Sequence, residues 1–332
     1  MAFQGRVHRT GTGNPGARDT TDIPASQDRD RFQGKGAWPV KALIFGANGQ
    51  DGYYLSEACR KRQIEVIGVS RSGPWICGDV ASPETVEKLV RGHRPEMIFH
   101  LAATSTTSHD AIYENHAAIG TGTINILESV KRWSPGSKVF ITGSGLQFIN
   151  NGQPISETDP FDHSSSYAAV RNYSVYLSRY FRNIGVQAYV GYLFHHESPL
   201  RGAQHLCQKI AQAARRIAEG SEEILELGDI SVRKEWTFAE NIAEGIITLI
   251  GQNQVFEATI GSGHAYSVED WLDECFKLIN KDWRHYVRQK RNFKAEYKIL
   301  VSNPATINSL GWQATTTIGE LAKIMMSHQD AK

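Results

Sequence analysis

Short apolar runs and amphipathic stretches alternate along the chain from about residue 39 onward. Apolar runs closed by glycine or polar residues predict buried strands at 40–45, 65–70, 97–101, 138–142 and 186–194. The stretches between them predict helices at 50–62, 83–91, 111–132 and 167–183. Strands that alternate with helices in this way predict a parallel sheet with helices on both faces, joined by right-handed crossovers.

The alternation becomes less regular after about residue 195. Helical stretches at 203–219, 238–250, 267–280 and 317–327 are separated only by short extended pieces. We therefore predict the α/β class, with a Rossmann-type doubly wound parallel sheet and a smaller C-terminal α/β substrate lobe. The expected boundaries are 39–195, with returning segments, for the sheet domain and 196–330 for the lobe.

Residues 1–38 show no hydrophobic period. They contain six glycines and two prolines but few aliphatic residues, so the segment cannot bury enough surface to fold alone. It has no apolar core of a signal peptide, and its four aspartates are atypical of a transit peptide. We expect a flexible N-terminal extension, and an arm that packs on a neighbouring subunit is the alternative.

Charge and composition narrow the class of partner. The 36 Lys and Arg residues balance 35 Asp and Glu residues, so no field of one sign favours nucleic acid or an acidic membrane. No apolar run reaches the roughly 18 residues of a membrane span. The four cysteines lie far apart without a C-x-x-C pair, which argues against a zinc ribbon or disulfide scaffold. We expect a cytoplasmic protein with a small-molecule partner.

A glycine-rich segment, Gly46-Ala-Asn-Gly-Gln-Asp-Gly52, follows the first predicted strand and opens the first predicted helix. This spacing lets the chain turn tightly, brings a pyrophosphate close to backbone N–H groups and packs the helix on the strand. The dipole at the helix N-terminus also favours phosphate. We therefore predict a dinucleotide site whose cofactor-binding residues include Gly46, Asn48, Gly49, Gln50, Asp51, Gly52 and Leu101.

The end of the second predicted strand selects the cofactor. It reads Val69-Ser-Arg-Ser72 and offers no acid to the ribose 2′-OH. An arginine at this place accepts a 2′-phosphate, so Arg71 favours NADP over NAD, and a solvated loop arginine is the alternative. Asp79 is expected to accept a hydrogen bond from the adenine amino group.

Three residues suit proton transfer coupled to hydride transfer. Ser144 follows the fourth predicted strand, and Tyr167 and Arg171 are four residues apart, so they share one face of a helix. A cation beside a tyrosine favours its phenolate form, and a serine hydroxyl can orient a substrate oxygen. We therefore predict Ser144, Tyr167 and Arg171 as catalytic residues, with Tyr167 and Arg171 also contacting the cofactor.

At these residues the chain resembles the extended short-chain dehydrogenase/reductase family, and within it the GDP-mannose 4,6-dehydratase-like nucleotide-sugar enzymes. The resemblance covers about residues 40–328 and is carried by Gly46–Leu55, Glu157–Phe161, Ser166–Arg171, Leu193–Gly202, Leu227–Trp236 and Leu310–Trp312. It implies a homodimer or homotetramer that binds NADP and a nucleoside-diphosphate sugar, with GDP-linked sugars favoured.

The resemblance also implies a mechanism. A 4,6-dehydratase transfers a hydride from C4 of the sugar while a tyrosine, matched by Tyr167, removes the hydroxyl proton. A glutamate then takes the C5 proton, and water leaves from C6. This chain departs from the family twice, because Arg171 replaces its lysine and Gly143-Ser-Gly-Leu-Gln147 carries no glutamate. A 4-keto-sugar-nucleotide reductase or epimerase and a non-catalytic NADP and sugar-nucleotide sensor therefore stay open as alternatives.

Polar residues of the second part of the chain are candidates for substrate binding. The expected set is His195, Glu197, Arg201, Lys209, Arg233 and Glu296. Arg201 and Lys209 would bind the diphosphate, with surface charge as the alternative. Arg233 and Lys234 stand in a block where relatives place a phosphate-binding arginine, and because their order is reversed from the family's, either could be the carrier. Glu296 resembles a ribose-contacting glutamate. Adjacent histidines on a strand point to opposite faces, so we expect no metal at His195 and its neighbour.

Overall fold

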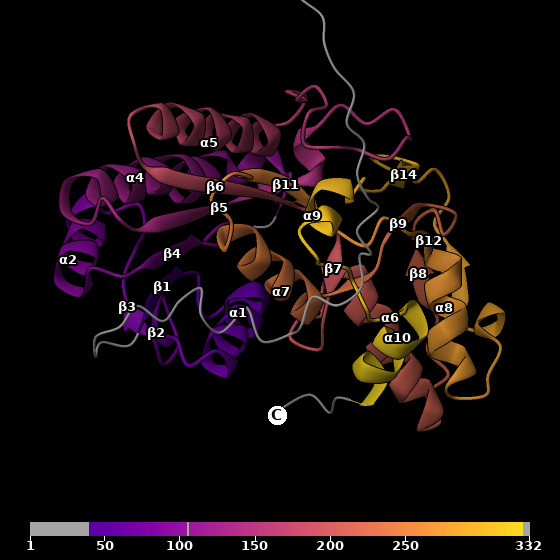
Figure 1. The fold of residues 1–332 in the computed structure, drawn as a ribbon. Helices are drawn as coiled ribbons and strands as arrows, with labels where there is room; N and C mark the ends of the chain where they lie inside the picture. Colours follow the sequence, from indigo (N-terminus) through magenta and orange to yellow (C-terminus); the bar gives the residue numbers. More distant parts are fainter. Residues whose placement is uncertain (1–39, 105, 328–332) are drawn as a thin grey trace, which may run out of the picture. The chain divides into compact units, whose positions relative to one another are not determined.

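The structure is a computed structural model that describes residues 40–104 and 106–327 (Figure 1). The described residues belong to one compact unit. The predicted N-terminal extension lies outside the described residues, and the expected boundary between sheet domain and lobe stays a prediction.

A seven-stranded parallel sheet lies at the centre of the fold. Its strands, in spatial order, are β3 (Ile76–Cys77), β2 (Glu65–Ser70), β1 (Lys41–Phe45), β4 (Met97–His100), β5 (Lys138–Ser144), β6 (Gln187–Leu193) and β11 (Glu257–Ile260). Phe45 pairs with both Val69 and His100, so the carboxyl ends of the central strands meet at one edge. The predicted doubly wound sheet is confirmed, and β3 and β11 are two short strands beyond the five predicted.

Helices cover both faces of this sheet (Figure 1). On one side α1 (Gln50–Lys61) packs against α7 (Ala239–Ile250). On the other side α2 (Pro83–His93), α4 (Gly122–Trp133) and α5 (Ser166–Asn183) pack together. The helix predicted over 111–132 is irregular at its start, where a 3-10 turn η1 (His109–Ala111), α3 (Ile112–Asn115) and a π-helical turn η2 (His116–Thr121) precede α4.

The C-terminal part combines helices with small sheets. Its helices are α6 (Leu206–Ala218), α8 (Val268–Lys277), α9 (Ala305–Ser309) and α10 (Ile318–Ser327). The three small sheets contain β7 (His196–Glu197) with β10 (Thr237–Phe238), β8 (Leu225–Leu227) with β13 (Val287–Gln289), and β9 (Arg233–Glu235) between β12 (Ala265–Ser267) and β14 (Ile299–Leu300). Two 3-10 turns, η3 (Gly145–Gln147) and η4 (Trp283–His285), complete the elements.

Buried apolar clusters stabilise these layers, and two of them fix the elements around the site. The first lies between the central sheet and its helices and includes Leu43, Ile98 and Val139, all fully buried. The second joins α6, α8 and α10 around Trp271, whose ring stacks on Trp236 with centroids 5.1 Å apart. Each large apolar side chain buried in this way contributes about 1.5–3 kcal/mol. The second core therefore fixes β9 and β10, which lead into the site described below.

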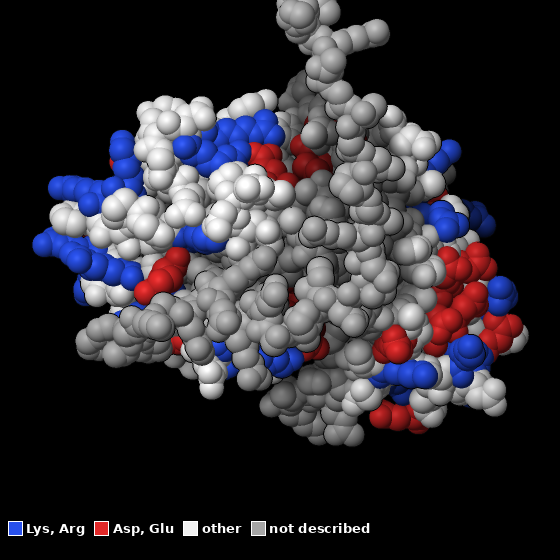
Figure 2. Space-filling model, in the orientation of Figure 1, with Lys and Arg blue, Asp and Glu red and all other residues white. Residues whose placement is uncertain are grey.

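The surface carries charges of both signs. Figure 2 shows acidic side chains gathered over α8 and basic ones beside α2 and α4. None of the helices in the described part of the chain is long and apolar enough to cross a membrane.

Candidate active site

A cavity of about 370 Å³ opens at the carboxyl ends of β1, β2 and β4. Six of the predicted cofactor-binding residues line it, namely Gly46, Asn48, Gly49, Arg71, Asp79 and Leu101. The strands carry these residues to one edge of the sheet, where doubly wound folds bind their ligands. The cavity therefore lies where the glycine spacing predicts a dinucleotide.

The glycines of this loop satisfy three different requirements. Gly46 has φ of +91°, and a Cβ there would lie 2.7 Å from the backbone nitrogen of Ala102. A Cβ on Gly52 would lie 2.4 Å from the Gly46 carbonyl oxygen, so this glycine lets α1 approach the loop. Gly49 caps α1 without a side-chain hydrogen bond, which leaves the first-turn N–H groups available to a phosphate. The loop thus fits a dinucleotide pyrophosphate.

Arg71 and Asp79 stand at the far end of this cavity, beyond β2. Arg71 is exposed, and the neighbouring Ser70 also lines the cavity. The Asp79 Oδ1 atom accepts a hydrogen bond of 2.9 Å from the Ala81 N–H, so its carboxylate is held in place. The strand end offers a cation and a hydroxyl, which is suitable for a 2′-phosphate.

A second cavity, of about 340 Å³, contains the predicted catalytic residues. Ser144, Tyr167 and Arg171 line it together, at the carboxyl ends of β5 and β6 and the start of α5. Ser165 Oγ accepts a hydrogen bond of 3.1 Å from the Ala168 N–H, so this N-cap places Tyr167 in the first turn of α5. Leu101 and Ala103 line both cavities, so the two spaces adjoin.

Tyr167 and Arg171 interact directly. The Arg171 Nε atom donates a hydrogen bond of 3.1 Å to the Tyr167 hydroxyl oxygen. Arg171 Nη1 donates to the backbone oxygen of Thr142, and the side chain is buried. Two anchors therefore hold the guanidinium against the tyrosine hydroxyl.

The turn after β5 presents an aliphatic side chain to the cavity. Leu146 lines the cavity, whereas Gln147 is fully buried behind it. Gln147 Oε1 accepts a hydrogen bond of 2.8 Å from the Ser144 N–H, and its Nε2 donates to Asn172 Oδ1 over 3.0 Å. Gln147 therefore holds the turn, and no proton acceptor from this turn reaches the cavity.

Two predicted cofactor residues make other contacts. Asp51 lines the catalytic cavity, and its Oδ1 lies 2.8 Å from His196 Nε2. Gln50 is almost fully buried, and its Oε1 accepts a hydrogen bond of 2.8 Å from Ser198 Oγ. Both residues tie the start of α1 to the segment after β6. These contacts join residues more than 140 positions apart, so local sequence patterns give no signal for them.

A third cavity, of about 360 Å³, lies in the C-terminal part. Lys209 and Lys234 line it, together with the aromatic residues Phe293 and Tyr297. Tyr297 and Glu296 also line the catalytic cavity, so these two spaces adjoin as well. Cations and aromatic rings in one cavity suit the phosphates and the base of a nucleotide.

Strand alternation separates Lys234 from Arg233. Arg233 is exposed on β9, and its Nη2 donates a hydrogen bond of 2.8 Å to the Ala265 backbone oxygen. Lys234 is buried and lies over the Trp236 ring, with its Nζ 4.9 Å from the centroid. Residues two apart on a strand share a face, so Lys234 lies on the same face as the buried Trp236. The apolar Trp236 is therefore the signal in the sequence that favours Lys234 over Arg233 as the inward-facing cation.

His195, Glu197 and Arg201 lie beside Lys234. His195 Nδ1 donates a hydrogen bond of 2.8 Å to the Glu235 backbone oxygen, and Lys234 Nζ lies 2.9 Å from its Nε2. Burial, helped by the Lys234 charge, lowers the pKa of His195 to about 4, so the imidazole is neutral. His195 and Arg201 line the catalytic cavity, whereas Glu197 is buried outside its lining, 3.7 Å from Arg201 Nε.

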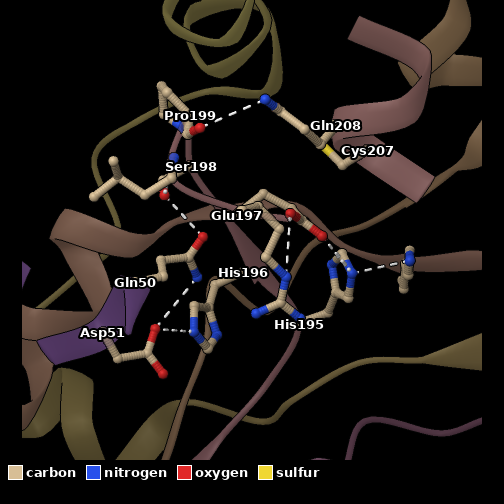
Figure 3. Close-up of polar contacts among 12 residues, drawn as sticks. Gln50, Asp51, His195, His196, Glu197, Ser198, Pro199, Cys207 and Gln208 are labelled. Atoms are coloured by element: carbon tan, nitrogen blue, oxygen red, sulfur yellow. Dashed lines mark hydrogen bonds and ion pairs between the residues drawn. The ribbon is translucent and has the colours of Figure 1, made fainter. Parts of the chain in front are cut away.

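No three His, Cys, Asp or Glu side chains within 40–104 and 106–327 are grouped so that they could hold a metal ion. His195 and His196 point to opposite sides of their segment (Figure 3).

Residues 43–325 match the protein family described as GDP-mannose 4,6 dehydratase. The chain belongs to this family. It is 27% identical to GDP-mannose 4,6 dehydratase 1 of Arabidopsis thaliana over 318 residues, which cover 86% of this chain and 88% of that protein. It is also 27% identical to the GDP-mannose 4,6 dehydratase of Dictyostelium discoideum over 336 residues, covering 86% of this chain and 94% of the relative.

Solved structures share the fold. A UDP-glucose 4-epimerase of Thermus thermophilus complexed with NAD superimposes with a TM-score of 0.73 at 19% identity, covering 87% of this chain and 98% of that one. RMD from Pseudomonas aeruginosa complexed with NADPH gives a TM-score of 0.75 at 16% identity, with coverage of 87% and 98%.

Proposed function

We propose that this member of the family is an enzyme that changes the oxidation state of C4 in a nucleoside-diphosphate sugar. The observation that carries the proposal is the catalytic cavity itself. It contains Tyr167 and Arg171, which are joined by a hydrogen bond, and it adjoins both the dinucleotide cavity and the third cavity. The bound nicotinamide cofactor would supply hydride acceptance and donation.

The side chains of the catalytic cavity have separate roles in this proposal. Tyr167 takes the proton of the C4 hydroxyl during oxidation and returns it during reduction. Arg171, whose Nε lies 3.1 Å from the Tyr167 oxygen, stabilises the phenolate. Ser144 orients the same sugar oxygen. Leu101 and Leu146 give this cavity an apolar lining beside these polar groups.

We propose NADP as the preferred cofactor and a GDP-linked sugar as the preferred substrate. Arg71 at the end of β2 supports the 2′-phosphate, since no acid stands there to bind a free 2′-OH. The similar proteins named above are GDP-mannose 4,6 dehydratases, which supports the GDP-linked sugar. Lys209 and Lys234 would contact the phosphates, and Glu296 the ribose.

A reaction without loss of water is the second candidate. Dehydration needs a group that takes the C5 proton, and the turn after β5 presents Leu146 instead of a carboxylate. A 4-keto-sugar-nucleotide reductase or epimerase needs only Ser144, Tyr167 and the cation. The aliphatic wall at Leu146 therefore favours this candidate over dehydration.

The exposed face of α5 supports a proposed homodimer or homotetramer. Tyr173, Tyr176 and Tyr180 follow one another at helical spacing, and Tyr176 is 57% exposed. A stripe of exposed aromatic residues on one helix suits burial against the same helix of a second copy. We propose a cytoplasmic location as well, which the scattered cysteines support.

The test is incubation of the purified protein with GDP-mannose and other sugar nucleotides, followed by mass spectrometry for a 4-keto-6-deoxy product. Absence of this product together with NADPH consumption on a 4-keto sugar nucleotide would establish the reductase. Binding of both ligands without any turnover would identify a sensor. Tyr167→Phe should lower turnover at least 100-fold, a loss of about 3 kcal/mol of transition-state stabilisation, while NADP still binds. Retained turnover in this variant would refute the role of the tyrosine.

A further inference from the structure

The segment Phe194–Ser198 joins α1 to the C-terminal part, and the side chains of its last four residues alternate between them. Figure 3 shows His196 and Ser198 beside Asp51 and Gln50, with His195 and Glu197 directed away from them. His196 and Ser198 contact α1, whereas His195 and Glu197 contact residues of the C-terminal part. The alternation follows from the extended backbone, in which successive side chains point to opposite sides. One short segment thus touches both the dinucleotide loop and the cations of the substrate cavities.

On the α1 side, consecutive hydrogen bonds run as a chain from the segment to the start of α1 and back to the segment. His196 Nδ1 donates to the Phe194 backbone oxygen over 2.7 Å, and its Nε2 donates to Asp51 Oδ1 over 2.8 Å. Gln50 Nε2 lies 3.3 Å from the same Asp51 oxygen and its Oε1 accepts from Ser198 Oγ over 2.8 Å. The chain begins and ends on the segment and passes through the first two residues of α1.

The central bond of this chain is an ion pair. Burial would raise the pKa of Asp51, but the charge and hydrogen bond of His196 lower it from 3.8 to about 2. Burial would lower the pKa of His196, but Asp51 raises it above 6.5. Arg201 faces the same pair and acts against the His196 charge. Both ring nitrogens of His196 thus face acceptor oxygens, and each charge of the pair stabilises the other.

On the other side, the segment holds two cations of the substrate cavities. His195 Nε2 accepts a hydrogen bond of 2.9 Å from Lys234 Nζ, and Lys234 lines the third cavity. Glu197 lies 3.7 Å from Arg201 Nε, and Arg201 lines the catalytic cavity. The Arg201 Nε atom is buried without a hydrogen-bond partner in the described part of the chain. A shift of the segment would therefore move both cations.

We propose that the Phe194–Ser198 segment couples the two binding sites, so that a bound dinucleotide raises the affinity for a nucleoside diphosphate, and that the His196–Asp51 ion pair transmits this coupling. Asp51 lies in the first turn of α1, directly after the glycine loop that the proposed function assigns to the dinucleotide pyrophosphate. Binding at the loop therefore orders the start of α1 and, through His196, the segment. The nucleoside diphosphate then binds to cations that are already fixed, so its binding costs the protein less conformational entropy. The identities of both ligands rest on the proposed function. His196 and Asp51 are positioning residues in this proposal.

The test is calorimetric titration of GDP into the full-length protein, alone and saturated with NADP. We expect NADP to tighten GDP binding by about 5- to 50-fold in the unmodified chain. His196→Gln and Asp51→Asn should each reduce this ratio to less than about twofold, while both ligands still bind. The reciprocal titration of NADP with and without GDP must give the same ratio, because linkage is symmetric.

Lys61→Gln is the matched control. It breaks the exposed ion pair between Lys61 and Glu240 at the other end of α1 and should leave the ratio unchanged. Ser198→Ala removes a neutral link of the same chain and should lower the ratio even if the charged variants unfold. A ratio of one in the unmodified protein, or an unchanged ratio in folded variants, would overturn the coupling and leave the proposed function standing. Failure of GDP and NADP to bind the unmodified protein would overturn the proposed function and the coupling together.

Discussion

Replacement of Asp51 by asparagine removes one charge from the ion pair and keeps the side-chain volume nearly constant. Burial opposes the charged carboxylate, but His196 lowers the pKa of Asp51 from 3.8 to about 2. One pKa unit corresponds to about 1.4 kcal/mol, so we expect Asp51→Asn to lower the free energy of unfolding by about 2 kcal/mol. The Asp51 side chain remains 26% exposed, which explains a loss below the roughly 3–5 kcal/mol of a fully buried pair.

The pH dependence of this loss follows from both partners. The pKa of Asp51 is lowered, so its contribution is present above 3.8 and is lost as the pH falls through about 2. The pKa of His196 is raised, so its contribution is present below 6.5 and is lost as the pH rises through the raised value. The difference in stability between the unmodified chain and the variant is therefore largest between about pH 4 and 6.5.

Urea unfolding followed by tryptophan fluorescence measures this difference. Lys61→Gln provides the reference, because its exposed ion pair with Glu240 should be worth about 0–1 kcal/mol. A loss of stability for Asp51→Asn no larger than that for Lys61→Gln near pH 5.5 would contradict a stabilising ion pair. A stability difference that stays constant when the pH rises well above the raised pKa of His196 would contradict it as well.

Three further predictions concern the cofactor loop and the oligomer. Arg71→Ala should weaken NADP binding about 10- to 100-fold, because charge-assisted hydrogen bonds are lost, and leave NAD binding nearly unchanged; equal losses for both cofactors in calorimetry would contradict the 2′-phosphate role. Gly52→Ala should abolish dinucleotide binding and destabilise the fold by about 1–3 kcal/mol, because the new Cβ would lie 2.4 Å from the Gly46 carbonyl oxygen. A melting temperature and an NADPH fluorescence titration like those of the unmodified protein would show that the loop accommodates the new Cβ. Tyr176→Lys combined with Tyr180→Lys should convert an oligomer into monomers without lowering Tm, and an unchanged mass by light scattering would place the interface elsewhere.

The elements that bear the site could be predicted from local sequence patterns. Each of the five predicted strands and eight predicted helices has a counterpart in the structure within a few residues, although the 111–132 helix is interrupted. Ser165 and Gly49 begin α5 and α1 through purely local geometry. The predicted trio Ser144, Tyr167 and Arg171 shares one cavity, because parallel strands bring their carboxyl ends to the same edge.

At two places, the strand face or the turn decides which of two neighbouring residues lines a cavity. Lys234, not Arg233, lines the third cavity, because a shift of one residue along a strand reverses the face. Leu146, not Gln147, lines the catalytic cavity, because Gln147 turns inward to hold Ser144 and Asn172. Residue type alone cannot distinguish such neighbours.

The sequence by itself therefore determined the family, the order of strands and helices, and the glycine loop with its demand for small residues. These features depend on backbone conformation and on patterns within about 20 residues, which the chain encodes locally. Only the tertiary structure decided which side chains face each cavity and which distant residues meet. The pairing of Asp51 with His196, 145 positions apart, is the clearest case. It forms because the sheet brings the start of α1 beside the end of β6, and the attraction between the two side chains opposes the desolvation cost of burying them.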